Sequence, residues 1–297
     1  MSPLRIGTRG SLLALTQARA VAKAIGGETE LVEITTAGDV DRARGDKSRW
    51  TGALEAALLA GDIDLAVHSA KDVPGELAEG TAIVAAPRRA DPFDVLIGED
   101  ELEQVREGAR VGTSALRRRA QLLAARPDLQ VVELRGNVDT RLRKLAAGGA
   151  DVLVLAAAGL ARLDRMREAG GRLDAELFVP AAGQGVIAVQ ARAGSPAADA
   201  ASVASHAATM KCLQAERAAI RALGASCHAP VGVSALLDTE TLHIRGFAGL
   251  PDGSEWVLDE HGAPADAPPE DAGRELARRM QLAGAGDVLR RAEAMAA

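Results

Sequence analysis

Basic side chains are concentrated in one part of the sequence, between residues 105 and 144. This stretch holds ten basic and four acidic residues, although the whole chain carries a formal net charge of −6. Arg117 and Arg118 follow Thr113 and Ser114 at the expected start of a helix. Backbone N–H groups and the helix dipole favour anions there, and guanidinium groups bind carboxylates or phosphates through paired hydrogen bonds. The cluster therefore indicates recognition of an acidic ligand.

A similar arrangement follows the next strand that the sequence predicts. Arg135, Gly136 and Arg141 lie at another transition from strand to helix. We interpret Arg135 and Arg141 as further anion-binding residues because both fall near the end of a strand. A solvated helix face is the simpler interpretation of three other arginines, Arg119, Arg126 and Arg143.

The N-terminal third carries a matching set of polar residues. Arg9 and Ser11 lead from a strand into a helix, and Ser69, Lys71 and Asp72 follow another strand. Lys71 and Asp72 could form a local surface ion pair worth roughly 0–1 kcal/mol. Alternatively, Asp72 is a carboxylate held among cations, which stays ionised and stabilises a cationic intermediate. His68, which precedes Ser69, fits a packing role as well as a functional one.

The chain has two cysteines, which differ in their surroundings. Cys212 lies in an amphipathic helix and is expected to be a buried core residue. Cys227 lies in a turn next to His228, which makes its thiol the better candidate for covalent chemistry. No metal site is expected, because His, Cys and carboxylate residues nowhere have the spacing of zinc ligands, and no phosphate-binding glycine motif occurs.

Composition excludes several classes of protein. Hydrophobic residues make up 47% and charged residues 26% of the chain, which is typical of a globular protein. The net negative charge and an aromatic content of 2% disfavour a nucleic-acid partner. The sequence shows neither a signal peptide nor a bilayer-spanning run, so we expect a cytoplasmic protein without a membrane role.

Short aliphatic runs alternate with amphipathic stretches in the N-terminal third. They predict strands at 4–6, 30–35 and 63–67, and helices at 11–25 and 51–60. This order is typical of a mainly parallel α/β sheet, whose ligands gather at the carboxyl ends of the strands. A second set of the same kind predicts strands at 110–112, 130–134 and 152–155, and helices at 113–125 and 137–147.

Three domains are expected from this order. A strand at 186–190 can return to the first sheet, so the first α/β domain comprises 1–87 plus 186–206, and the second comprises 91–180. Two crossings between them predict a hinge with a cleft. Residues 209–297 predict a small α+β domain with a long helix at 209–223, strands at 231–237, 241–248 and 255–260, a loop at 262–270, and two closing helices.

The same segments carry a resemblance to a known family. In order and spacing they resemble the porphobilinogen deaminase (hydroxymethylbilane synthase) family over nearly the whole chain. The segments are Gly7-Thr-Arg-Gly-Ser-Leu-Leu-Ala-Leu15, Val67-His-Ser-Ala-Lys-Asp-Val-Pro74, Val111-Gly-Thr-Ser-Ala-Leu-Arg-Arg118, Leu134-Arg-Gly-Asn-Val-Asp-Thr-Arg141, Ala158-Gly-Leu-Ala-Arg162, Pro180-Ala-Ala-Gly-Gln-Gly185 and Cys227-His-Ala-Pro-Val-Gly232.

The resemblance implies two α/β domains like those of periplasmic binding proteins and a third domain that carries a cysteine. It implies a dipyrromethane cofactor joined to Cys227 through a thioether. It further implies that four porphobilinogen molecules are condensed head to tail into hydroxymethylbilane with release of ammonia, in porphyrin and haem biosynthesis. A monomer is also implied. Each pyrrole ring carries an acetate and a propionate, so the growing product needs many cations.

Residue roles follow from the matching positions. The resemblance implies catalysis by Asp72, with Lys71 and Arg9. Cofactor binding is implied for Cys227, Ser69, Lys71, Asp72, Thr113, Ser114, Arg117, Arg118, Arg135 and Gly136. Substrate binding is implied for Arg9, Ser11, Arg135, Arg141, Arg162 and Gln184.

The chain departs from the family pattern in its first third. A family Gly-Gly-Lys-Gly-Leu-Phe segment is replaced by Gly45-Asp-Lys-Ser-Arg-Trp50 within a shorter loop, so that Lys47 and Trp50 stand where the family has its lysine and aromatic ring. The alternative function is a non-catalytic, two-lobed binding protein for a carboxylate-bearing ligand. Asp72 and Cys227 favour an enzyme, because a carboxylate binder has no use for either.

Overall fold

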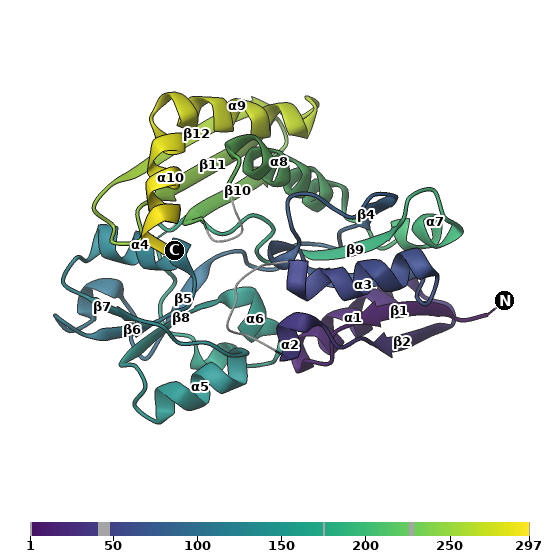
Figure 1. Ribbon diagram of the computed structural model, residues 1–297, viewed down its shortest axis with the longest axis horizontal. Helices are drawn as coiled ribbons and strands as arrows, with labels where there is room; N and C mark the ends of the chain where they lie inside the picture. Colours follow the sequence, from purple (N-terminus) through teal and green to yellow (C-terminus); the bar gives the residue numbers. More distant parts are fainter. Residues whose placement is uncertain (1, 41–47, 175, 226–228, 297) are drawn as a thin grey trace. The chain divides into compact units, whose positions relative to one another are not determined.

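The computed structural model describes residues 2–40, 48–174, 176–225 and 229–296 (Figure 1). The chain forms two compact units, one comprising Met1–Ala90 with Gly185–Leu213 and the other Asp91–Gln184 with Gln214–Ala297. Each unit has its own sheets and core and is described here by itself. The division into three domains stays a prediction.

The first unit is built on a five-stranded sheet with the order β2-β1-β3-β9-β4. Its strands are β1 (Leu4–Thr8), β2 (Thr29–Glu33), β3 (Leu65–Ser69), β4 (Thr81–Ala85) and β9 (Ile187–Arg192). Strand β1 pairs in parallel with β2 and β3, whereas β9 is antiparallel to both β3 and β4. The return of β9 to this sheet is thus confirmed. Four of the five strands run in the same direction, so the expectation of a mainly parallel sheet is also confirmed, with β9 as the antiparallel strand.

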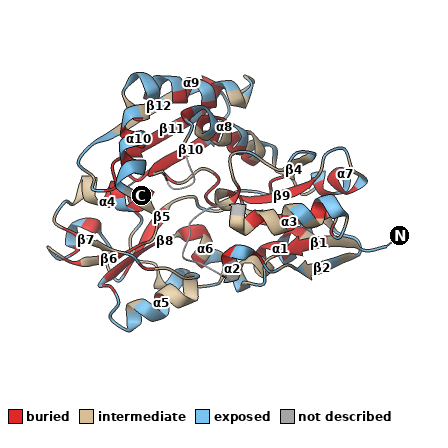
Figure 2. Cartoon of the chain, viewed as in Figure 1, coloured by how far each residue is buried: buried red, intermediate tan, exposed pale blue. Residues whose placement is uncertain are grey.

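Helices cover both faces of this sheet. They are α1 (Leu12–Ile25), α2 (Ala37–Val40), α3 (Ser48–Ala60) and α7 (Pro196–Ser202). Ser11 caps α1 as predicted, since its hydroxyl accepts a hydrogen bond from the Ala14 N–H at 3.3 Å. Successive residues of β3 point to opposite faces, so that Leu65 and Val67 join a core with α1 and α7, and Ala66 joins one with α3. Strand β9 of the same sheet is buried over almost its whole length (Figure 2).

The second unit contains a four-stranded sheet with the order β5-β8-β6-β7. Its strands are β5 (Asp94–Ile97), β6 (Arg110–Gly112), β7 (Gln130–Val132) and β8 (Val152–Ala156), and its helices are α4 (Leu116–Ala125), α5 (Val138–Ala146) and α6 (Ala157–Arg162). Leu122 of α4 packs on one face, and Leu142 of α5 and Leu160 of α6 pack on the other. Strand β5, which the sequence analysis missed, is antiparallel to β8.

A three-stranded antiparallel sheet follows in the same unit. Its strands are β10 (Val231–Leu237), β11 (Thr241–Gly249) and β12 (Trp256–Pro264), and its helices are α9 (Pro269–Leu282) and α10 (Ala285–Ala296). The division between the two units falls within α8 (Ala207–Leu223), after Leu213. The predicted loop at 262–270 begins too early, because β12 stays paired with β11 through Thr241 and Pro264. The α/β class with a small α+β C-terminal part is confirmed.

Among the described residues, no helix is long and apolar enough to span a bilayer.

Candidate functional site

A pocket opens in the first unit, beside the carboxyl ends of β1 and β3. These strands are parallel neighbours, with Ile6 opposite Leu65, so the turns that follow them lie together. The pocket brings together four predicted site residues, Arg9, Ser11, Ser69 and Asp72. The other lining residues are Leu13, Ala14, Gln17, Trp50, Thr51, Val67 and His68.

Local structure fixes the polar groups of this pocket. Asp72 ends a short 3₁₀-helix, Ala70–Asp72, whose first N–H donates to the Val186 carbonyl at 3.0 Å. Ser69 exchanges hydrogen bonds with the buried amide of Gln17, at 2.9 and 3.2 Å. Among the described lining residues, Asp72 is the one carboxylate and Arg9 the one guanidinium. The pocket can therefore hold a cationic centre and an acidic group at the same time.

His68 forms part of the pocket wall as a buried, uncharged residue. Its Nε2 lies 3.1 Å from Oε1 of Gln190. The Gln190 amide nitrogen donates to Glu55 and Thr81, which leaves Oε1 as an acceptor and assigns the proton of His68 to Nε2. Burial lowers the pKa of His68 to about 4, against the opposing effects of Glu55 and Gln190. The packing interpretation therefore fits His68 best.

Replacing His68 with Gln is expected to flatten the pH dependence of stability. The folded-state pKa of about 4 lies below the unfolded value of about 6.5, so the unfolded chain binds the extra proton in this window. The free energy of unfolding should then fall by about 2 kcal/mol between pH 7.5 and pH 5 through His68 alone.

Urea unfolding of wild-type and His68→Gln protein at both pH values measures this effect. At pH 7.5 the variant reports only lost packing, which serves as the internal reference. If the free energy of unfolding of His68→Gln falls between pH 7.5 and pH 5 by as much as that of the wild type, His68 does not cause this pH dependence.

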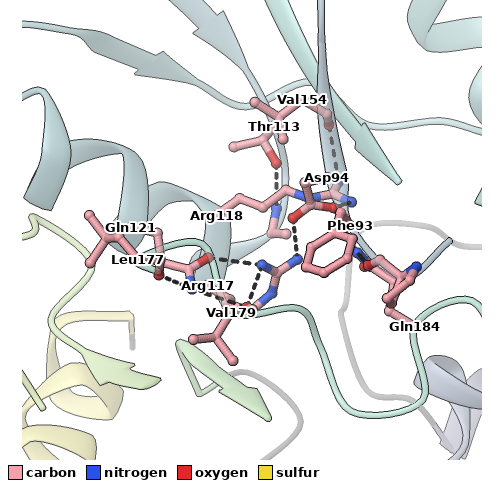
Figure 3. A network of polar contacts seen from close by, with 12 residues as sticks. Phe93, Asp94, Thr113, Arg117, Arg118, Gln121, Val154, Leu177, Val179 and Gln184 are labelled. Carbon is pink, nitrogen blue, oxygen red and sulfur yellow. Dashed lines mark hydrogen bonds and ion pairs between the residues drawn. The ribbon is translucent and has the colours of Figure 1, made fainter. Parts of the chain in front are cut away.

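The second unit gathers three predicted site residues around a buried carboxylate (Figure 3). The guanidinium groups of Arg117 and Arg118 each donate to one oxygen of Asp94, at 2.7 Å. The amide nitrogen of Gln184 donates to Asp94 Oδ1 at 2.8 Å. Arg117 and Arg118 are only 5% and 4% exposed. The predicted anion-binding arginines thus have an anion of their own within the protein.

Further contacts fix this cluster in place. Arg117 also donates to Gln121 and to the carbonyl of Val179, at 2.8 and 2.9 Å, and Arg118 donates to the Val154 carbonyl at 3.0 Å. Burial alone would raise the pKa of the Asp94 carboxyl, but the two guanidinium groups hold it well below its usual range. The carboxylate is therefore charged at every physiological pH.

A third group lies at the start of α5 and in the turn before α4. Arg141 donates to the hydroxyl of Ser114 at 3.1 Å, which joins two predicted site residues. Gly136 has a φ of +134°, and a Cβ there would lie 2.7 Å from the side chain of Thr140. Asn137 caps α5 through the Thr140 N–H at 3.0 Å. These features place backbone donors and a guanidinium at one helix start.

The remaining predicted residues lie apart from these contacts or have local partners. Thr113 is buried and accepts from the Ala115 N–H at 3.2 Å, so α4 begins at Leu116 and not at Thr113 as predicted. The side chain of Arg135 pairs with Glu133. Burial lowers the pKa of Arg162, at the end of α6, to about 10, which keeps it charged. Lys71 is half-buried in the 3₁₀-helix.

Two predicted features lie outside the described residues. One is Cys227 with its neighbours Ser226 and His228, and the other is Lys47. Their roles stay predictions.

Sequence reasoning missed Asp94 as a site residue. Its signal was the single carboxylate at the start of an apolar run, Asp94-Val-Leu-Ile97, in a chain that also has three consecutive arginines at 117–119. Such a carboxylate in a buried strand needs cationic partners. Thr51, whose buried hydroxyl lacks a partner among the described residues, was also missed, and no sequence signal marks it.

Residues 4–200 match the family described as "Porphobilinogen deaminase, dipyromethane cofactor binding domain", and residues 210–281 match "Porphobilinogen deaminase, C-terminal domain". Among solved structures, the Bordetella pertussis BvgS periplasmic VFT2 domain covers 68% of this chain and 86% of its own, at 15% identity and a TM-score of 0.40.

Curated relatives match over almost their whole length. The porphobilinogen deaminase of Moorella thermoacetica is 44% identical over 99% of this chain and 98% of its own. That of Xanthomonas oryzae pv. oryzae is 45% identical over 97% and 99%. That of Rubrobacter xylanophilus is 44% identical over 96% of each. With both family matches, these relatives show that the chain belongs to the porphobilinogen deaminase family.

Proposed function

We propose that this chain condenses porphobilinogen molecules head to tail, with release of ammonia, into the linear tetrapyrrole hydroxymethylbilane. The observation that carries the proposal is the pocket in which Asp72 and Arg9 lie together. Porphobilinogen has a pyrrole N–H and an aminomethyl group, together with an acetate and a propionate. A pocket with one carboxylate, one guanidinium and hydroxyl groups matches both halves of such a molecule.

Asp72 acts on the reacting centre. Loss of ammonia from the substrate leaves positive charge on the pyrrole system, and a fixed carboxylate stabilises that charge. The same carboxylate accepts a hydrogen bond from the pyrrole N–H and so orients the ring. Arg9 and Ser11 donate to the substrate's carboxylates from the start of α1. Lys71 adds positive charge beside Asp72 in the sequence.

The alternative of a non-catalytic binding protein is less well supported. Asp72 lies inside the pocket, where its charge would repel an acidic ligand if binding were the only task. The cost of that repulsion is offset when a cationic centre forms during the reaction. The carboxylate therefore favours catalysis.

A dipyrromethane cofactor fits the residues of this chain. The match over residues 4–200 is to a dipyromethane cofactor binding domain. When bound, dipyrromethane supplies the pyrrole carbon to which the first substrate unit is added. We assign its thioether to Cys227, and its binding to Ser69, Lys71, Asp72, Thr113, Ser114, Arg117, Arg118, Arg135 and Gly136.

The charges of the buried cluster support the assignment of Arg117 and Arg118. Two guanidinium groups face one carboxylate, Asp94, so the three groups carry one positive charge in excess. The Nε of Arg118 is buried and has no hydrogen-bond partner in the described part of the chain. A buried excess charge with an unused donor suits a carboxylate of the bound cofactor.

Substrate binding is assigned to Arg9, Ser11, Arg135, Arg141, Arg162 and Gln184. The hydrogen bond between Arg141 and Ser114 supports the placement of Arg141 beside other polar groups. We further propose that the enzyme is a cytoplasmic monomer whose partner is its substrate, with no nucleic acid, membrane or metal ion involved. We also propose that the chain has the three domains predicted from its sequence, 1–87 plus 186–206, 91–180 and 209–297.

Intact-mass spectrometry of the purified protein tests the cofactor assignment. The wild-type chain should carry a covalent adduct of two pyrrole rings, and Cys227→Ala should lack it. Cys212→Ala is the matched control, because Cys212 is buried in α8 and should leave the adduct in place. An adduct that survives in Cys227→Ala would contradict the assignment.

Product analysis tests the reaction itself. Wild-type protein given porphobilinogen should release four ammonia molecules for each tetrapyrrole formed. Binding of porphobilinogen without ammonia release would instead favour the binding-protein alternative.

A further inference from the structure

Trp50 is the lining residue whose role the proposed reaction leaves open. It lies in the first turn of α3, and its ring stands 4.1 Å from the guanidinium carbon of Arg9. Arg9 comes from the turn between β1 and α1, so two separate elements meet in this contact. Both side chains line the pocket that contains Asp72. The contact is therefore part of the site and not of a remote surface.

Gly38 in α2 determines where the indole ring can lie. A Cβ built on Gly38 would lie 2.5 Å from two carbons of the Trp50 ring, closer than any side chain can approach. The ring thus packs directly against the backbone of a buried glycine. Any larger residue at position 38 must displace the ring, and with it the surface on which Arg9 rests.

Stacking on an aromatic ring suits a guanidinium that also binds a carboxylate. The guanidinium carbon of Arg9 lies over the face of the Trp50 ring, where the ring attracts the cation. A guanidinium has five N–H donors, so it can contact a ring and still form paired bonds to a carboxylate. A long arginine side chain that is already held in one place loses less freedom when its ligand binds.

We propose that Trp50, seated on Gly38, is a positioning residue that holds the Arg9 guanidinium in place for a carboxylate of the substrate. The proposal rests on the proposed function, because that function supplies the acidic pyrrole. Trp50 acts through Arg9, so its effect falls on substrate binding and not on the step that Asp72 assists. Gly38 contributes by leaving room for the ring.

Steady-state kinetics with porphobilinogen separate these effects. Trp50→Leu should raise KM about 5- to 20-fold and leave kcat within about 2-fold, because a lost cation–π contact weakens binding alone. Trp50→Phe keeps an aromatic face and should stay within about 3-fold of the wild-type KM. A Trp50→Phe variant as impaired as Trp50→Leu would overturn the proposal.

Glycine variants supply a matched pair. Gly38→Ala should displace the ring and raise KM as Trp50→Leu does, although it changes no group that touches the substrate. Gly52→Ala is the control, because Gly52 lies in α3 with Trp50 and a Cβ there would have no neighbour within 4 Å. Equal KM values for Gly38→Ala and Gly52→Ala would contradict the seating of Trp50 on Gly38.

A double-mutant cycle tests whether Trp50 acts through Arg9. In an Arg9→Met background, Trp50→Leu should change KM by less than about 2-fold, because the group that it positions is already gone. The same 5- to 20-fold rise in both backgrounds would mean that Trp50 acts on the substrate independently, and the proposal would fail.

Fluorescence provides a readout that does not depend on turnover. The chain has two tryptophans, so Trp256→Phe leaves Trp50 as the sole indole. Adding Arg9→Met to that variant should shift or brighten the Trp50 emission, as the cation leaves the ring. If Arg9→Met alters the Trp50 emission but the Trp256→Phe protein does not consume porphobilinogen, only the proposed function is refuted. If Arg9→Met leaves the emission unaltered, the pairing of Trp50 with Arg9 is refuted.

Discussion

Replacing Asp72 with Asn is expected to lower the turnover of porphobilinogen by about 10²–10³-fold while the protein still folds. Among the described residues that line the first-unit pocket, Asp72 is the one carboxylate, so no neighbour there can replace its charge. Removing one fixed group that stabilises transition-state charge has an effect of this size in other enzymes. The side chain is half-buried, and the amide has the same shape, so packing should be retained.

The measurement is the rate of ammonia release at saturating porphobilinogen, with intact-mass spectrometry of the same sample. The adduct should remain detectable in Asp72→Asn, because the thiol that carries it is unchanged. Asp199→Asn is the control, since Asp199 is an exposed carboxylate on α7 of the same unit and outside the pocket. Near-normal turnover in Asp72→Asn would show that its charge is dispensable.

The grouping of Arg9 and Ser11 with Ser69 and Asp72 could be predicted from the sequence for a simple reason. Each pair follows a strand in a βαβ unit, and the carboxyl ends of neighbouring parallel strands lie at one edge of a sheet. The Ser11 cap is a local signal that needs no tertiary information. Where local pattern and strand order decide the structure, the sequence was sufficient.

The return of β9 to the first sheet was predicted from the sequence. Its strand partners and its direction were not, because no local signal specifies them. Val189 pairs with Val67, more than a hundred residues earlier, and no local pattern specifies that these two strands run antiparallel. Strands β4 and β5 were missed although Gly80 and Pro87 flank the first and Pro92 and Gly98 flank the second. Long-range pairing therefore limits what a sequence pattern can specify.

The surroundings of Arg117 and Arg118 show the same limit at the level of a site. The sequence predicted that these two arginines lie near the start of a helix, and they lie in the first turn of α4. Their shared partner, Asp94, lies in β5, a strand that the sequence analysis did not predict. The two arginines could thus be identified as cations from the sequence, but their partial neutralisation by Asp94 could not be predicted.

That shared partner leads to the largest expected effect on stability. Asp94→Asn is expected to lower the free energy of unfolding by about 3–5 kcal/mol, because it leaves two buried guanidinium groups without their counter-charge. The amide offers one acceptor oxygen where the carboxylate offers two, so one arginine also loses its hydrogen bond. The pKa of Asp94 lies below its usual range, so the contribution is complete above about pH 4.

Urea unfolding at pH 7 measures the loss, with Asp287→Asn as the control. Asp287 pairs with Arg290 at 3.2 Å on the surface of the same unit, where such a pair contributes about 0–1 kcal/mol. Adding Arg118→Met to Asp94→Asn should restore part of the stability, since one uncompensated buried charge is removed with its partner. Losses in the two single variants that simply add in the double variant, or a loss below about 1 kcal/mol in Asp94→Asn, would mean that water reaches the cluster and that Asp94 does not neutralise the arginines.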